Sequence, residues 1–174
     1  MRTLYRSATL LMTIGLLAGC GIFATAPETA RQPTAPAYDL VAAIRAAGDR
    51  EKSVIDVNPL RDPSVTALQD AAQRDEQTGN YAEAATRLDQ ALRLSPNSPD
   101  LLQERAEIAV RLRDFGTAEK LAHQSWSLGP KLGPLCARNW QTMVEMRLQA
   151  NDVAGAQTAR KWVQQCHKAG IPRY

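Results

Sequence analysis

A chain of 174 residues has room for one modest globular domain with tails, but not for two large domains. The formal net charge is +3, but Arg2 and Arg6 lie at the extreme N-terminus, and the other basic residues are interleaved with Asp and Glu. A nearly neutral domain of this kind argues against nucleic acid as the main partner, and it predicts an ordinary solvated surface.

Residues 1–19 have the order of a secretory signal peptide. Two arginines precede residues 8–18, which are apolar and uncharged, and residues 17–20 read Leu-Ala-Gly-Cys. The apolar stretch is shorter than the roughly 20 residues that a membrane-spanning helix needs. We therefore expect residues 1–19 to be removed during export.

The end of this segment resembles the lipobox of bacterial lipoproteins, in which Leu, a small residue and Gly or Ala precede the Cys. The resemblance implies that the Cys20 thiol receives a diacylglycerol and that the new amine is acylated, with palmitate as a typical chain. Several acyl chains, each worth about 0.8 kcal/mol per buried CH₂, make such an anchor permanent. Gly21 in place of Asp implies, by the enterobacterial sorting rule, an outer-membrane anchor facing the periplasm in preference to the inner membrane. We expect no cofactor besides this covalent lipid.

Residues 20–37 are predicted to be a flexible tether. Pro27, Pro33 and Pro36 occur here among Thr and Ala, and such a composition cannot bury enough apolar surface to offset the entropy lost on ordering. The folded part of the chain is therefore expected to begin near residue 38.

A short amphipathic helix is predicted next, within an N-terminal segment and connector of residues 38–63. Asp39 can cap its start and Gly48 suits its end. Its apolar face consists of Leu40, Val41, Ile44 and Ala47. We expect this face to pack on the rest of the domain as a cap, and the alternatives are that it lies on a membrane or awaits a partner. Residues 53–63 allow no assignment.

The remainder of the sequence repeats with a period of 34 residues. The matching pairs are Tyr81 and Phe115, Ala84 and Ala118, Leu94 and Leu128, and Pro96 and Pro130. This pattern resembles the tetratricopeptide repeat, a helix-turn-helix unit of the same length. The resemblance implies an all-α helical repeat array of about three units plus the N-terminal helix, seven helices in all.

The repeat domain is predicted to cover residues 64–174. Its units lie near 65–98, 99–132 and 137–170, and the third is displaced by four extra residues placed within 131–135. Small residues at equivalent places should let paired helices approach closely, namely Ala84, Ala118 and Ala156. Equivalent residues before the second helices are predicted to cap them, namely Asn80, Asp114 and Asp152.

Cys136 and Cys166 are equally far from Asn151 at the turn of the third unit, so an antiparallel hairpin places them side by side. In an oxidising periplasm we expect a disulfide that staples this divergent unit. The alternative is a redox or metal site that also uses His167, but the chain has no CxxC motif.

The family resemblance further implies that the first helix of each unit lines a concave groove. The residues at groove-facing positions are Gln69, Gln73, Gln103, Glu107, Arg111, Gln141 and Glu145, with Arg138 adding positive charge. Such a polar lining of mixed sign suits an extended peptide or a partner helix, and the alternative is a merely solvated helix face. The Lys and Asn that clamp acidic C-terminal peptides in chaperone-binding members are absent from these positions, so that role is not expected.

The sequence contains no Gly-rich phosphate loop, HExxH or GxSxG motif, so we expect neither an enzyme nor a metal site or small-molecule substrate. The predicted function is a membrane-anchored periplasmic scaffold or adaptor that binds another periplasmic or outer-membrane protein. It resembles small repeat lipoproteins that assist pilus assembly, secretin insertion or peptidoglycan hydrolase recruitment. The alternatives are a structural envelope lipoprotein that dimerises without a peptide groove, and a thiol- or metal-dependent enzyme.

Overall fold

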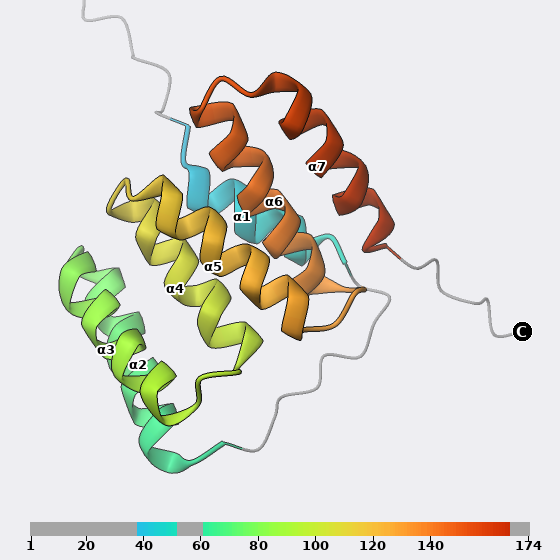
Figure 1. The fold of residues 1–174 in the computed structure, drawn as a ribbon. Coiled ribbons are helices and arrows are strands. Elements are labelled where there is room, and N and C mark those ends of the chain that lie inside the picture. The colour runs from blue at the N-terminus through green and yellow to red at the C-terminus, as the bar shows by residue number, and fades with distance from the viewer. Residues whose placement is uncertain (1–37, 52–60, 168–174) are drawn as a thin grey trace, which may run out of the picture. The chain divides into compact units, whose positions relative to one another are not determined.

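The computed structural model describes residues 38–51 and 61–167, which fold into seven α-helices and no strand (Figure 1). The helices are α1 (Leu40–Asp49), α2 (Pro63–Gln77), α3 (Tyr81–Leu94), α4 (Pro99–Arg111), α5 (Phe115–Leu128), α6 (Pro134–Gln149) and α7 (Val153–Gln165). The predicted all-α repeat array is confirmed over these residues. The predicted signal peptide, Cys20, the tether and most of the connector lie outside the described residues. Within the described ranges, no helix has the length and apolar character needed to cross a membrane.

The last six helices form three consecutive hairpins, α2 with α3, α4 with α5, and α6 with α7. Each hairpin packs on the next, through α3 against α4 and through α5 against α6 (Figure 1). Ala84, Ala118 and Ala156 are fully buried on the second helix of each hairpin, where a larger side chain would keep the helices apart. The 34-residue pattern therefore marks packing positions.

The turn inside each hairpin has the same backbone geometry. Gly79, Arg113 and Asn151 have positive φ angles of 80°, 61° and 59°. In the first hairpin the Asn80 amide donates to the Asp75 carbonyl at 2.8 Å, and equivalent bonds close the other two turns. This left-handed ending satisfies carbonyls at the end of the first helix, and it disfavours a residue with a side chain by roughly 1–2 kcal/mol. Only the first turn has a glycine to avoid that strain.

Three of the predicted helix caps are present. The carboxylates of Asp39, Asp114 and Asp152 accept hydrogen bonds from backbone amides three residues later, at 3.0, 3.1 and 2.8 Å. The prediction is wrong for Asn80, which makes no capping bond to α3. Its side-chain amide donates instead to the Thr78 hydroxyl at 3.0 Å. The other two turns carry no hydroxyl at this place, so nothing there competes for the capping side chain.

Two boundaries differ from the predicted ones. Helix α2 begins at Pro63, because the Asp62 carboxylate accepts the Ser64 amide at 2.8 Å and Pro63 suits the first turn. Helix α6 begins at Pro134, inside the predicted insertion, and has 16 residues where α4 has 13. The extra residues of the third unit therefore extend its first helix in addition to its loop.

Candidate partner-binding groove

Helix α1 packs against α6 and α4, the first helices of the last two hairpins. Its apolar face is buried there, with Val41, Ile44 and Ala47 at most 1% exposed. A Cβ added to Gly48 would lie 2.8 Å from Cγ of Arg138, so only glycine permits so close an approach. The prediction that this helix packs on the repeats is therefore confirmed, in preference to its lying on a membrane or awaiting a partner. It covers the helix faces that were predicted to line an open groove.

A buried carboxylate joins α1 to both of these helices. The Glu107 side chain, 0% exposed, accepts hydrogen bonds from Arg45 Nε at 2.7 Å, from Arg138 Nη2 at 2.6 Å and from Gln103 Nε2 at 2.9 Å. Arg45 also donates to Glu76 of α2 at 2.9 Å. Burial alone would lower the pKa of the Arg45 guanidinium, but Glu76 and Glu107 raise it above its ordinary value. Arg45 thus stays charged and links α1 to α2 and α4.

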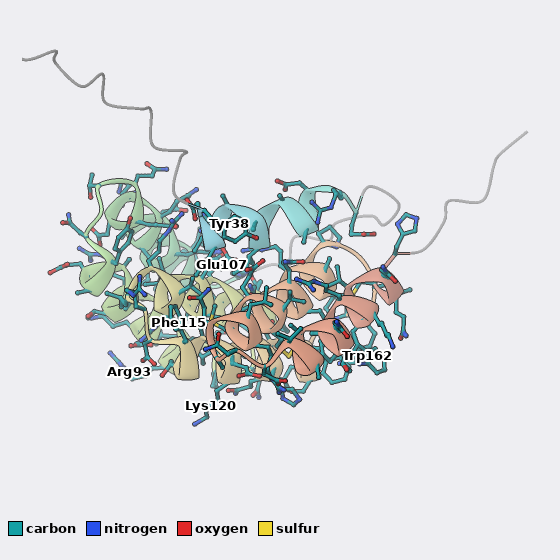
Figure 2. All side chains as sticks on the ribbon, turned by 90° about the horizontal axis from the view of Figure 1, so that it is seen from above. Tyr38, Arg93, Glu107, Phe115, Lys120 and Trp162 are labelled. Atoms are coloured by element: carbon teal, nitrogen blue, oxygen red, sulfur yellow. A yellow bond between two sulfur atoms is a disulfide. The ribbon has the colours of Figure 1, made fainter. Side chains whose placement is uncertain are left out.

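The start of α1 is held by further polar contacts. Arg111 Nη1 donates to the Asp39 carboxylate at 2.8 Å, and the Tyr38 hydroxyl donates to the Glu145 carboxylate at 2.8 Å. Burial and the bond to Glu145 raise the pKa of Tyr38. Gln141 Nε2 also donates to Glu145, at 2.7 Å. Figure 2 shows Tyr38 and Glu107 on the same side of the domain, where α1 lies.

The seven predicted groove residues therefore separate into three groups. Gln103, Glu107 and Glu145 are at most 2% exposed, so their prediction as an open lining is wrong while α1 is in place. Arg111 and Gln141 are partly exposed and bonded within the α1 contact. Gln69 and Gln73, on α2, lie in the part of the groove that remains open, which Arg111 also lines. Two residues of α1 were the sequence signals that this helix covers the groove. Arg45 meets the carboxylates of Glu76 and Glu107, and Gly48 leaves room for the Arg138 side chain.

The open part of the groove has a volume of about 1400 Å³. It lies between α2, α4, the second half of α1 and the loop before α6, and the residues that define it include Arg45, Arg61, Gln69, Asp70, Gln73, Glu76, Asp100, Glu104, Ile108, Arg111, Leu132 and Arg138. Gln69 Nε2 donates to the Glu104 carboxylate at 2.6 Å, and Arg61 pairs with Asp100. Burial raises the pKa of the Glu104 carboxyl, while the bond from Gln69 opposes the rise. Charges of both signs thus surround a floor with apolar patches.

A disulfide joins Cys136 of α6 to Cys166 at the end of α7, with the Cα atoms 5.6 Å apart. The Gly133 amide donates to the Cys166 carbonyl at 2.8 Å, which ties the loop before α6 to the same place. His167 turns away and its Nδ1 lies 3.0 Å from the Glu51 carboxylate. Within the two described ranges, no cluster of three or more His, Cys, Asp or Glu residues is arranged to hold a metal.

Residues 65–108 match the sequence profile of the tetratricopeptide repeat. Among solved structures, the globular C-terminal domain of P. aeruginosa LpoP is 28% identical, with a TM-score of 0.57, and the match covers 60% of this chain and 99% of that one. The first TPR of Spaghetti (RPAP3), bound to HSP90 peptide SRMEEVD, is 18% identical, with a TM-score of 0.55, and the match covers 62% of this chain and 84% of that one. The second likeness shows the fold alone. No curated protein sequence matches this chain.

These matches agree with the repeated hairpins, the equivalent turns and the buried alanines described above. Each observation identifies the same unit of two antiparallel helices, and the matched profile covers the unit with the best sequence agreement. Residues 65–108 therefore match the tetratricopeptide repeat, and the part of the chain that the structure describes has the fold of a tetratricopeptide-repeat array.

Proposed function

We propose that this protein is a membrane-anchored periplasmic adaptor that binds a segment of another protein in the open part of its groove. Tetratricopeptide repeats are protein-interaction modules, and this coarser role follows from the fold. The observation that carries the proposal is the groove of about 1400 Å³ beside α2, where charged side chains of both signs surround an apolar floor. Such a lining suits an extended or helical segment that offers both charges and apolar side chains.

Helix α1 indicates what this surface can hold. It places an apolar stripe against the first helices of the repeats and engages their carboxylates through Arg45. The partner segment is expected to use the same chemistry in the neighbouring open part, through apolar anchors flanked by charges. Since Gln103, Glu107 and Glu145 are already covered, the partner should contact α2 and the exposed edge of α4.

The anchor is proposed from the sequence. The motif ending in Cys20 supports lipidation and export, and the disulfide is a bond that oxidising compartments preserve. The match to a globular domain of P. aeruginosa LpoP, at 28% identity, is consistent with an envelope role. We place the protein on the outer membrane, facing the periplasm.

The groove is tested by crosslinking and affinity capture of the full-length protein from its own membranes. A double variant, Asp70→Ala with Gln73→Ala, removes one carboxylate and one amide from exposed positions of the open groove. The matched control, Glu83→Ala with Thr86→Ala, removes one carboxylate and one hydroxyl from exposed positions of α3. We expect the groove variant to lose a specific partner that the control retains. An unchanged set of partners in the groove variant would overturn this assignment of the surface.

The anchor is tested separately with Cys20→Ala. We expect this variant to lose incorporation of labelled palmitate and to move from the membrane fraction to the soluble fraction. Retention in the membrane fraction without lipid would contradict anchoring through Cys20.

A further inference from the structure

All three tryptophans of the chain gather on its last two hairpins. The ring centroids of Trp126 (α5) and Trp140 (α6) are 5.1 Å apart with edge-to-face geometry, and those of Trp140 and Trp162 (α7) are 5.2 Å apart and stacked. Trp162 is 40% exposed, and the other two rings are half-buried. Figure 2 shows Trp162 on α7, well separated from Tyr38 and the start of α1. A cluster of partly exposed indoles is typical of surfaces that bind a partner.

The three rings enclose a pocket of about 270 Å³. Lys131, Gln165 and Cys136 of the disulfide complete its lining. The Lys131 ammonium is held 4.4 Å from the centroid of the Trp126 ring and donates to the Ser127 carbonyl at 3.0 Å. The pocket therefore has rigid aromatic walls and a positively charged rim.

The hydrogen-bonding character of this lining is one-sided. An indole N–H and an ammonium donate but do not accept, and disulfide sulfur is a weak acceptor. Among the lining residues, only the Gln165 side-chain oxygen is a strong acceptor, and none is a carboxylate. A sugar would bring many hydroxyl donors, for which the lining side chains offer one strong acceptor, the Gln165 oxygen. The complementary ligand has flat apolar rings and acceptors without donors.

Proline-rich peptides have this chemistry. Proline lacks a backbone N–H, and in the polyproline II helix its carbonyls project into solvent while its rings stack well on aromatic side chains. We propose that the pocket formed by Trp126, Trp140 and Trp162 binds a proline-rich segment of a partner protein in the polyproline II conformation. An acidic residue next to the prolines would lie against Lys131 and strengthen binding.

This pocket shares no lining residue with the open groove beside α2. The proposal therefore does not depend on the groove, and the protein can hold two segments at once, each on a different face. Because Trp140 and Trp162 lie on the two helices joined by the disulfide, the oxidised protein is the form that presents the complete pocket.

The test titrates the full-length protein with a peptide of about ten prolines, long enough for several turns of polyproline II. Tryptophan fluorescence reports binding directly, because every tryptophan lies at the proposed site. A Gly-Ser peptide of the same length and a cellulose oligosaccharide serve as negative probes. We expect saturable binding of oligoproline alone, and a complex formed with the sugar but not with oligoproline would overturn the proposal.

Variants locate the site. Trp162→Ala should weaken oligoproline binding at least about tenfold, as expected for removal of a central aromatic anchor. Trp162→Phe keeps an aromatic face and should restore part of the affinity. Leu112→Ala is the control, since Leu112 is similarly exposed at 43% but lies outside the pocket lining. Circular dichroism checks that each variant is folded, and binding by calorimetry that is equal in all four proteins would overturn the assignment.

A chain ending at His167 distinguishes a partner from the protein's own C-terminal residues. We expect the truncated and full-length proteins to bind oligoproline equally. If only the truncated chain binds oligoproline, then residues 168–174 compete for the pocket in the full-length protein and the proposal for a partner is overturned.

Discussion

Gln73 on α2 and Glu107 on α4 occupy the same position of the repeat, but their surroundings differ. Gln73 is exposed beside the open groove, whereas Glu107 is 0% exposed beneath α1 and bonded to Arg45 and Arg138. The covered end of the array uses its first helices to hold part of its own chain. The open end has the same helix faces without such a cover. The position of a residue in the repeat therefore fixes the direction in which its side chain points. Whether another helix lies in that direction decides if the residue stabilises the fold or is free to bind a partner.

The two ends should also differ in stability. In a repeat array each unit is stabilised mainly by its neighbours. The first hairpin packs mainly on α4 and meets α1 only through the ion pair of Arg45 with Glu76, while the last two hairpins pack extensively on α1 and carry the disulfide. We expect the first hairpin to unfold before the rest.

Removing the disulfide should have the largest effect, because it staples the covered end. The bond joins residues 30 apart, and a loop of that length implies about 3–4 kcal/mol of stabilisation on the chain-entropy account. Reduction, or Cys136→Ala with Cys166→Ala, should lower the stability of the last hairpin toward that of the first. Urea unfolding of oxidised and reduced protein measures the difference, and coincident curves would contradict it.

The pair Glu107 and Gln73 gives a direct comparison of the covered and open positions. Glu107→Ala removes one of the two hydrogen bonds from Gln103, which keeps its bond to Thr142. It also breaks two ion pairs, but Arg45 and Arg138 are partly exposed and can regain water. We therefore expect a loss of about 2 kcal/mol, less than for a fully buried pair. Gln73→Ala should change stability by less than about 0.5 kcal/mol, as for other surface substitutions. If chemical denaturation shows that the two variants lose equal free energy of unfolding, then the cover provided by α1 does not cause the difference between the two positions.

The helix caps provide a smaller test. Asp114 accepts the Thr117 amide at the start of α5, and its pKa is lowered by these bonds. Asp114→Ala should cost about 1 kcal/mol at neutral pH. This contribution requires the ionised carboxylate, so it should disappear as the pH falls through the lowered pKa. Asn80→Ala removes no capping bond and should cost less. A larger loss for Asn80→Ala in thermal unfolding would contradict the observed geometry.

The smallest effect is expected at Glu104, which lies in the open groove. Its pKa is raised in the folded protein, chiefly by burial, so the folded state retains the proton to higher pH than the unfolded chain. The stability difference between Glu104→Gln and the unaltered protein should therefore grow as the pH rises above the ordinary range of Glu, with the variant more stable at neutral pH. The two proteins should converge in acid. Parallel stability curves across this range would contradict the raised pKa.

The sequence predicted the helices and hairpins well because their signals are local and repeated. Small residues and turns recur at fixed spacing, and Asp114 and Asp152 cap where predicted. The groove was predicted less well, because its cover depends on Arg45 meeting Glu107, a contact between residues 62 apart that no periodicity reveals. Asn80 departed from its equivalents because of one neighbouring hydroxyl.

The aromatic pocket illustrates the same limit. Nothing in the sequence indicates that Trp126, Trp140 and Trp162 form one pocket. They meet only because three helices from two hairpins converge. Chemistry that arises from convergence of distant helices is visible only once the packing of those helices is known.

The confinement of every tryptophan to one end has a consequence for spectroscopy. The tryptophan emission of this protein, excited selectively, reports only α5, α6 and α7, whereas far-ultraviolet dichroism averages over all seven helices. The packed indoles of Trp140 and Trp162 should also give dichroism in the near-ultraviolet, which is lost when their hairpin opens. If the open end melts first, the far-ultraviolet dichroism will fall while the tryptophan emission and the near-ultraviolet dichroism remain unchanged, so the two ends can be followed separately without any label.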